Sequence, residues 1–208
     1  MRVLTVNVVE ELIPGPKETG LTAIDKRPQG RRMEVGELGL VGDSVCDIKN
    51  HGGPDQALYS YAQEDADWWA GQLEREIPSG LFGENLRTEG LDITNALIGE
   101  VWRLGDEVEV MVRAPRIPCI TFQHRMEIPG WVKRFHQEGR PGAYLKVLKT
   151  GSIGADDTIA IVSRPDHEGT VGVMFEAQDS AKMQRMLDSD VDLVDELRAV
   201  AQRIAARA

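Results

Sequence analysis

The sequence predicts a mainly β protein with α additions, in which a closed or nearly closed barrel precedes a small helical appendage. Short apolar runs separated by Gly-rich or Gly-Asp turns recur over residues 2–162, and many short strands with such turns are typical of a barrel. After about Pro165 the apolar residues instead recur at helical spacing. We therefore expect one domain over residues 1–164 and a three-helix element over residues 165–208.

Local patterns predict the individual elements. Alternating Val residues before Pro115 indicate a half-buried strand, which should pair with the preceding strand through a hairpin turning at Gly105-Asp106. Trp68, Trp69 and Leu73 at helical spacing predict one helix, and Pro129 at the start and Gly139 at the end predict a second. The further expected strands are residues 2–9, 44–48, 140–148 and 158–162, and the expected helices are residues 63–75 and 129–138.

Composition limits the classes of function. The 208 residues carry a formal net charge of −10, which disfavours duplex nucleic acid as a partner. No apolar run approaches the roughly 20 residues that span a bilayer, and the first residues lack a secretory signal, so we expect a cytoplasmic protein. Cys46 and Cys119 form no CxxC pair, and we expect both thiols to remain unpaired, with Cys119 in the main pocket and Cys46 in the barrel wall.

The stretch from Arg113 to Thr121 is the strongest candidate for chemistry. Pro115 cannot donate to a sheet and Pro118 fixes φ, so Cys119 should lie in a stiff loop at a strand end. Arg113 and Arg116 are close in sequence, and nearby cations lower a thiol pKa and so favour the thiolate, which is the nucleophile and metal ligand. A buried core cysteine explains the same residues equally well.

Other polar residues gather near glycines. Gly52-Gly53-Pro54 allows a close approach of backbone to a ligand, with His51 and Asp55 on either side. Another Gly loop carries Glu84 and Asn85. Lys26 and Arg27 are either a solvated face or a cradle for an anion such as phosphate. No P-loop, GxGxxG, HExxH or GxSxG motif occurs, and the histidines lack zinc-ligand spacing.

Eight stretches, taken in order, resemble the MOSC family, the domain found at the C-terminus of molybdenum cofactor sulfurases, and most of all its stand-alone, YiiM-like bacterial members. They cover roughly residues 3–163, and the helical tail is similar to the three-helix element of those proteins. The stretches are Val6-Asn7, Lys26-Arg27-Pro28, Gly39-Leu-Val-Gly-Asp43, His51-Gly-Gly-Pro-Asp55, Phe82-Gly-Glu-Asn-Leu86, Ile98-Gly99, Pro115-Arg-Ile-Pro-Cys119 and Gly139-Arg-Pro-Gly-Ala-Tyr144.

The resemblance implies a β-barrel-like fold that binds the molybdenum cofactor, a molybdopterin. It implies that Cys119 is the catalytic residue and the molybdenum ligand, or that it handles sulfur. The remaining residues that the resemblance implies in cofactor binding are Lys26 and Arg27 at the phosphate, Arg116 near the metal, His51, Asp55 and Asn85 along the pocket, and Arg140.

The implied reaction is reduction of N-hydroxylated bases or similar small molecules, with electrons from a separate reductase. A cofactor carrier, a sulfur-transfer module and a non-catalytic binding domain are the alternatives. Two positions depart from the family pattern: Thr121 stands where a Lys is frequent, and Gly169 and Gly172 fall at the start of the first tail helix. The apolar stripes of the tail should pack on the barrel or on a second subunit, which would make a homodimer.

Overall fold

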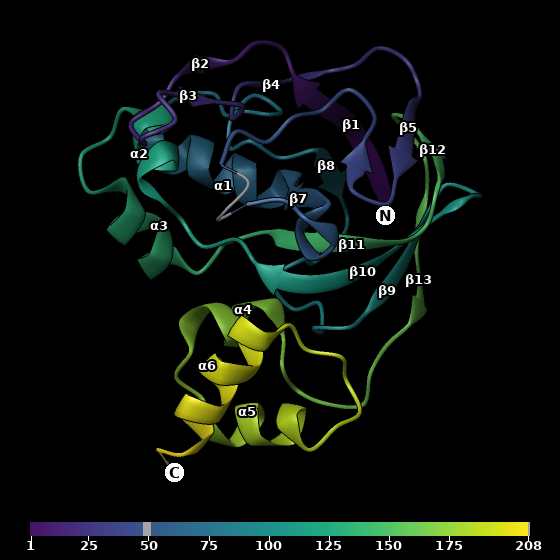
Figure 1. Cartoon of the computed structure of the whole chain (residues 1–208), viewed down its shortest axis with the longest axis vertical. Coiled ribbons are helices and arrows are strands. Elements are labelled where there is room, and N and C mark those ends of the chain that lie inside the picture. The colour runs from purple at the N-terminus through teal and green to yellow at the C-terminus, as the bar shows by residue number, and fades with distance from the viewer. Residues whose placement is uncertain (48–50, 208) are drawn as a thin grey trace.

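A single eight-stranded sheet forms the centre of the molecule (Figure 1). The computed structural model describes residues 1–47 and 51–207. The strand order is β13-β9-β10-β11-β7-β8-β1-β4, and every neighbouring pair is antiparallel except β7 with β8. The strands are β1 (Arg2–Val9), β4 (Lys26–Pro28), β7 (Leu58–Ala62), β8 (Leu86–Glu89), β9 (Val101–Leu104), β10 (Val108–Pro115), β11 (Ala143–Lys149) and β13 (Ile159–Ser163).

The predicted barrel closure is not confirmed, because the sheet ends at β13 on one side and at β4 on the other. A single isolated bridge between Arg2 and Thr158 brings the start of β1 next to the start of β13. Further closure would need the free edge of β1, but β4 already pairs with Asn7, Val8 and Val9 along that edge. The architecture is therefore a curved, open, mixed sheet with helices, rather than a closed barrel.

The parallel pair β7–β8 arises from α1 (Gln63–Leu73), which connects the two strands. Parallel neighbours need such a crossover, whereas antiparallel neighbours need only a short turn. The hairpin of β9 and β10 is of the second kind, and it turns at Gly105-Asp106 as predicted. The two helices predicted before the tail are also confirmed, as α1 and α3 (Trp131–Glu138).

Two small sheets extend the N-terminal half. One has the order β12-β5-β6 and the other pairs β2 with β3. Their members are β2 (Ile13–Pro14), β3 (Leu21–Thr22), β5 (Met33–Gly36), β6 (Gly39–Leu40) and β12 (Gly151–Ile153). The strand expected over residues 44–48 is wrong for residues 44–47, which are irregular, while residue 48 lies outside the described residues. Asp47 in this segment pairs with the Lys17 side chain rather than joining a strand ladder.

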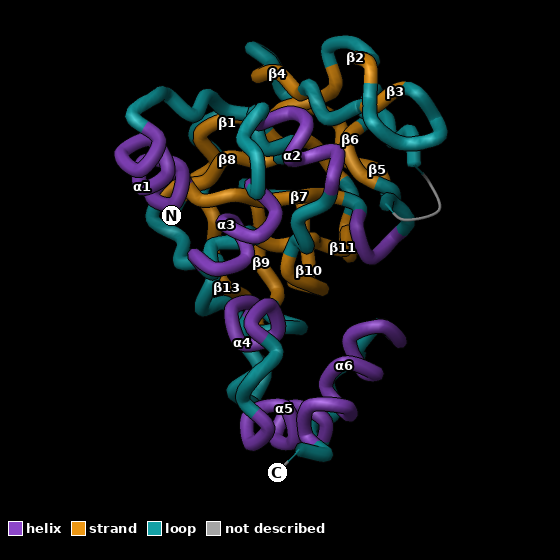
Figure 2. The backbone as a smooth tube through the Cα atoms, turned by 90° about the vertical axis from the view of Figure 1, so that its left-hand side faces the viewer, coloured by secondary structure: helices purple, strands orange, loops and turns teal. Residues whose placement is uncertain are grey.

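Three helices follow β13, namely α4 (Val171–Glu176), α5 (Ser180–Leu187) and α6 (Asp195–Ala205). Figure 2 shows them below the strands, with α2 (Ile120–Met126) and α3 in front of the sheet and α1 at its left side. Gly169 permits close packing, since a Cβ there would lie 2.3 Å from Met186 Sδ. Gly172 does the same against Thr94, where a Cβ would come within 2.9 Å of the methyl group. Both glycines therefore seat the first tail helix instead of weakening it.

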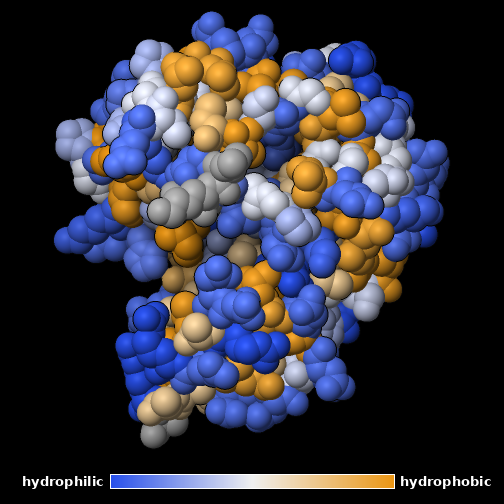
Figure 3. All heavy atoms as spheres, in the orientation of Figure 1, coloured by the Kyte–Doolittle hydropathy of each residue, from blue (hydrophilic) through white to orange (hydrophobic). Residues whose placement is uncertain are grey.

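The buried apolar residues form two clusters. The larger one runs without a break from the sheet into the tail, so the division at residue 164 stays a prediction. The smaller one is aromatic, with Trp69, Phe82, Phe122, Trp131 and Phe135 in mutual contact under α1–α3. None of the described helices is both long and apolar enough to cross a bilayer. Figure 3 shows a largely hydrophilic face with separate apolar patches.

Candidate functional site

A cavity of about 390 Å³ opens between the N-terminal segments and the loop that follows β10. Its size is in the usual range for small-molecule sites. Apolar and polar side chains from distant parts of the chain share its wall. Those used below are Lys26, Asp43, Cys46, His51, Gln56, Tyr59, Asn85, Arg116, Cys119 and Tyr144.

Cys119 lies at the junction of β10 and α2. Regular pairing of β10 ends at Pro115, as predicted, and Cys119 is the extended residue that precedes the first turn of α2. Phe122 and Met126, one helical turn apart, are both fully buried in the aromatic cluster and fix this helix. The thiol is consequently held on the cavity wall by packing on one side and by two prolines on the other.

The surroundings of Cys119 favour the thiolate. Burial alone would raise the pKa of the thiol, but a hydrogen bond with the His51 side chain and the positive charge of Arg116 lower it. The backbone amide of Phe122 and the charge of His51 act in the same direction, and the resulting pKa is about 6. Cys119 is therefore largely ionised at neutral pH, as a nucleophile or soft metal ligand must be.

Arg116 is a buried cation that forms no ion pair with a carboxylate of the described residues. It is 5% exposed, and its guanidinium carbon lies 3.7 Å from the centre of the Phe122 ring. Its Nη1 has no hydrogen-bond partner, and no ion pair to it occurs within residues 1–47 and 51–207. An unpaired buried donor is costly, so this atom marks a place for an anionic or hydrogen-bond-accepting ligand.

The two adjacent cations of β4 have opposite surroundings. Lys26 faces the cavity but already pairs with Asp43, which also accepts a hydrogen bond from Asn85 Nδ2 at 2.7 Å. Burial lowers the pKa of Lys26, although Asp43 acts against the shift. Arg27 points the other way, is half exposed and pairs with Asp25. Arg116, rather than Arg27, therefore supplies positive charge to the cavity.

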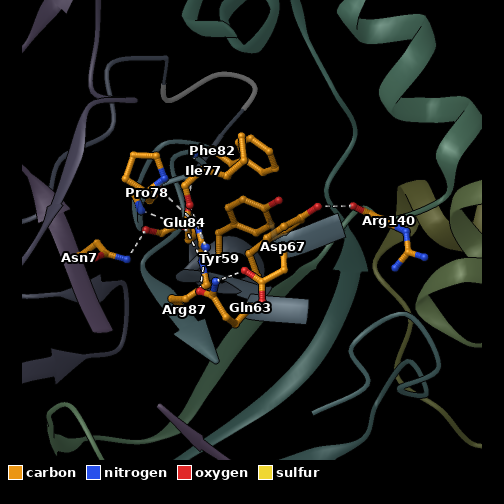
Figure 4. Close-up of polar contacts among 12 residues, drawn as sticks. Asn7, Tyr59, Gln63, Asp67, Ile77, Pro78, Phe82, Glu84, Arg87 and Arg140 are labelled. Atoms are coloured by element: carbon orange, nitrogen blue, oxygen red, sulfur yellow. Dashed lines mark hydrogen bonds and ion pairs between the residues drawn. The ribbon is translucent and has the colours of Figure 1, made fainter. Parts of the chain in front are cut away.

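A buried ion pair shapes the Gly loop below the cavity (Figure 4). Glu84 and Arg87 are both fully buried and bonded to each other. The carboxylate of Glu84 also accepts from the backbone N–H groups of Gly80 and Phe82, at 2.8 and 3.1 Å. Glu84 is therefore the anchor of the loop, which brings Phe82 and Asn85 to the cavity wall.

The structure brings together five of the expected site residues and leaves three outside. Lys26, His51, Asn85, Arg116 and Cys119 line the cavity, and Arg27, Asp55 and Arg140 do not. Asp55 pairs with Arg113 at 2.7 Å, and Arg140 pairs with Asp65 beside Trp68.

The expected position of Cys46 is wrong. It lies in an irregular segment, not in a strand, and it lines the same cavity as Cys119. Both thiols are free, as predicted. The segment lacks strand pairing, because the neighbouring carboxylates of Asp43 and Asp47 bond instead to Val9 N and to Lys17.

Three cavity residues were not anticipated. Burial raises the pKa of Tyr59 and Tyr144, which keeps both phenols neutral. Gln56 Oε1 is buried without a hydrogen-bond partner. The alternation of side chains between the two faces of β7 and β11 could have shown which face carries Tyr59 and Tyr144. No residue pattern around Gln56 predicts that it lies at the cavity.

The donor set fits a cofactor that carries its own ligands. No group of three or more His, Cys, Asp or Glu side chains capable of holding a metal ion exists among the described residues. One ionised thiol remains, together with a buried cation, Arg116, whose Nη1 has no hydrogen-bond partner. A soft thiolate suits a sulfur-rich metal centre, and the cation suits an anionic group.

Sequence comparison identifies the family of the chain. The model of the MOSC domain family matches residues 47–160. The chain belongs to the MOSC family. It is 36% identical over 143 residues to the uncharacterized protein YflK of Bacillus subtilis and 33% identical over 146 residues to the protein YiiM of Escherichia coli. Each match covers 69% of this chain, but only 64% and 65% of those relatives.

A third relative, named a reductase, comes from Gibberella moniliformis. It is 33% identical over 147 residues, which are 26% of its length. Among solved structures, YiiM from Geobacillus stearothermophilus superposes with a TM-score of 0.77 at 25% identity, covering 98% of both chains. YiiM from Escherichia coli gives 0.73 at 25% identity, covering all of this chain and 94% of that chain. These whole-chain matches indicate a YiiM-like fold that includes the C-terminal helices.

Proposed function

We propose that this protein binds the molybdenum cofactor and reduces N-hydroxylated bases or similar small molecules. The observation that carries the proposal is that one cavity wall holds a thiol of pKa about 6 and a buried cation, Arg116, whose Nη1 has no hydrogen-bond partner. Family membership supports the choice of cofactor. Cys119 would be the molybdenum ligand, and the bound metal would supply the two-electron chemistry that removes the N-bound oxygen as water.

The residues of the chain would bind and orient. Cys119 would hold the metal, and His51 would keep the thiol ionised through their hydrogen bond. Arg116 would offset negative charge close to the thiolate. Asp43, which accepts a hydrogen bond from Asn85, holds the ammonium of Lys26 at the cavity wall. There the ammonium would donate to an anionic part of the cofactor while remaining paired with Asp43. The neutral phenols of Tyr59 and Tyr144 would supply polar but uncharged contacts.

A separate reductase would supply electrons. The sequence has no nicotinamide- or flavin-type glycine motif, so the chain itself offers no obvious source. The fungal relative supports this view, because it is named a reductase and the matched stretch is only 26% of its length, which leaves room for further domains.

The test is molybdenum content and N-hydroxylamine reduction, measured for wild type, Cys119→Ser and Cys46→Ser made in a host that synthesises the cofactor. Cys119→Ser exchanges a soft donor for a hard one of similar size, so its metal content and turnover should collapse while its melting temperature is kept. Cys46→Ser is the matched control thiol, and it should retain metal. If Cys119→Ser keeps both metal and turnover, the assignment of the ligand is wrong.

Sulfur transfer is the second candidate, because both thiols line one cavity. In that role the Cys119 thiolate would attack the outer sulfur of a donor persulfide, becoming a persulfide itself and releasing the donor as its thiol, and the protein would not reduce N-hydroxylated compounds. Mass spectrometry of Cys119 after exposure to such a donor, together with the turnover assay, separates the two functions.

A further inference from the structure

Arg113 in β10 is a buried cation whose partners come from two distant parts of the chain. Its side chain is 3% exposed. Its Nε donates to Asp55 Oδ1 at 2.7 Å, Nη1 donates to the backbone carbonyl of Asp192, and Nη2 lies 3.2 Å from the Asp192 carboxylate. A buried guanidinium is costly unless it is paired and hydrogen-bonded. Arg113 therefore favours the arrangement in which both segments remain on the sheet.

The first partner is close to the cavity. Asp55 belongs to the short 3-10 helix η1 (Pro54–Gln56), and three residues separate it from His51. Two of the three, Gly52 and Gly53, have φ of 83° and 79°, and the third is Pro54, whose ring fixes φ. Glycine adopts such φ values freely, so the restraint comes from the shortness of the link and from Pro54, and the position of Asp55 limits how far away His51 can lie. His51 and Cys119 line the same cavity, and the His51 side chain lowers the pKa of the thiol.

The second partner belongs to the tail. Asp192 lies between α5 and α6, in the segment that climbs from the bottom of the molecule to the underside of the sheet in Figure 1. Its neighbours hold this segment in place. Leu193 is 5% exposed and joins the main core. Val191 packs closely on Gly99, because a Cβ added at Gly99 would lie 2.6 Å from Val191 Cγ2.

We propose that Arg113 is a positioning residue, which ties the segment before α6 to the loop of Asp55 and thereby holds His51 beside Cys119. The inference rests on the proposed function, in which Cys119 is the working thiolate. It gives the C-terminal helices a part in the site, although none of their residues lines the cavity.

The experiment follows the His51 ring directly, in the full chain without cofactor. Histidine is labelled with ¹⁵N, and the ring signals of His51 are assigned with a His51→Gln variant at one fixed pH. Asp192→Ala, Asp55→Asn and Arg113→Lys should each displace the His51 signals by more than a line width. Asp190→Ala is the matched control, because Asp190 is an exposed carboxylate in the same segment as Asp192, and it should leave them in place. The side chain of Asp192 is 71% exposed, so its variant should fold.

The other three histidines serve as internal references. Unchanged signals of His124, His136 and His167 in Asp192→Ala, with displaced His51 signals, support the proposal. Displacement of the signals of all four histidines would indicate a general loosening of the structure and would overturn the proposal. A His51 signal that responds to Asp55→Asn but not to Asp192→Ala would also overturn it. The double variant of Asp55 and Asp192 should displace His51 no more than the larger single change, because both act through one arginine. Molybdenum plays no part in this readout, so a failed metal assay and a failed positioning role are distinguishable.

Discussion

The ionisation of Cys119 is the property on which the site depends most directly. With a pKa of about 6, about nine in ten Cys119 thiols are ionised at pH 7, against a few per cent for an ordinary thiol of pKa about 8.5. His51→Gln removes both the hydrogen bond and the charge of His51, two of the influences that lower the pKa. Burial and Arg116 remain in the variant, so the pKa should rise by about one unit or more.

The assay is the rate of iodoacetamide alkylation at Cys119 against pH, followed by mass spectrometry so that Cys46 is counted separately. The midpoint should lie near pH 6 in the wild type and at least about one unit higher in His51→Gln. His124→Gln is the control, because the ring of His124 is not among the groups that shift Cys119. A wild-type midpoint near that of a free thiol, or equal midpoints in wild type and His51→Gln, would refute the reasoning.

Three further predictions concern stability, measured by urea unfolding. Between pH 6 and about 8.5 the Cys119 thiol binds more protons in the unfolded chain than in the folded one, so the free energy of unfolding should rise with pH. Cys119→Ser should lack this rise, and equal slopes of unfolding free energy against pH in wild type and variant would contradict the prediction. Arg87→Met should lower the free energy of unfolding by about 3–5 kcal/mol, because it leaves the buried carboxylate of Glu84 without its cation. A decrease of less than about 1 kcal/mol would show that Arg87 and Glu84 do not form a buried ion pair. Gly80→Ala should destabilise the protein by more than about 1 kcal/mol, because Gly80 has a φ of 85° and an added Cβ would lie 2.1 Å from the Lys26 carbonyl oxygen. Gly71→Ala in α1 is the control, and it should stabilise the protein by about 0.5–1 kcal/mol.

The elements predicted best from sequence are those that local chemistry decides. The β9–β10 hairpin follows from Gly105-Asp106 between alternating residues. Helix α3 follows from Pro129 before it, Gly139 after it and the four-residue spacing of Trp131 and Phe135. Helix α2 was missed, because its first residues are β-branched or aromatic and its N-cap is a cysteine without a side-chain capping bond. Only burial of Phe122 against rings from elsewhere in the chain decides that it is helical.

The site was predictable in its thiol and less so in its charges. Cys119 and Arg116 adjoin the same prolines, so one motif identified both. Lys26 and Arg27 are neighbours in a strand, and strand geometry alone required that they face opposite sides. The pairing of Lys26 with Asp43 could not be read from the sequence, because it depends on how β4 and the turn after β6 meet. Arg113 was grouped with the thiol from proximity, whereas its actual partners lie 58 and 79 positions away.

Strand β1 also constrains the order in which the chain can fold. Arg2 near its start binds Glu89 and Asp156, which are 87 and 154 positions later. At a synthesis rate of about 5–20 residues per second, about 8–30 s pass between the appearance of Arg2 and that of Asp156. The edge of β1 that faces β8 stays unpaired until Leu86–Glu89 is made, and the Arg2 and Val3 end lacks its second partner until Asp156 to Thr158 appear. Unpaired edges of apolar strands favour aggregation. We expect folding yield to depend on factors that shield extended apolar segments until the turn before β13 has been made.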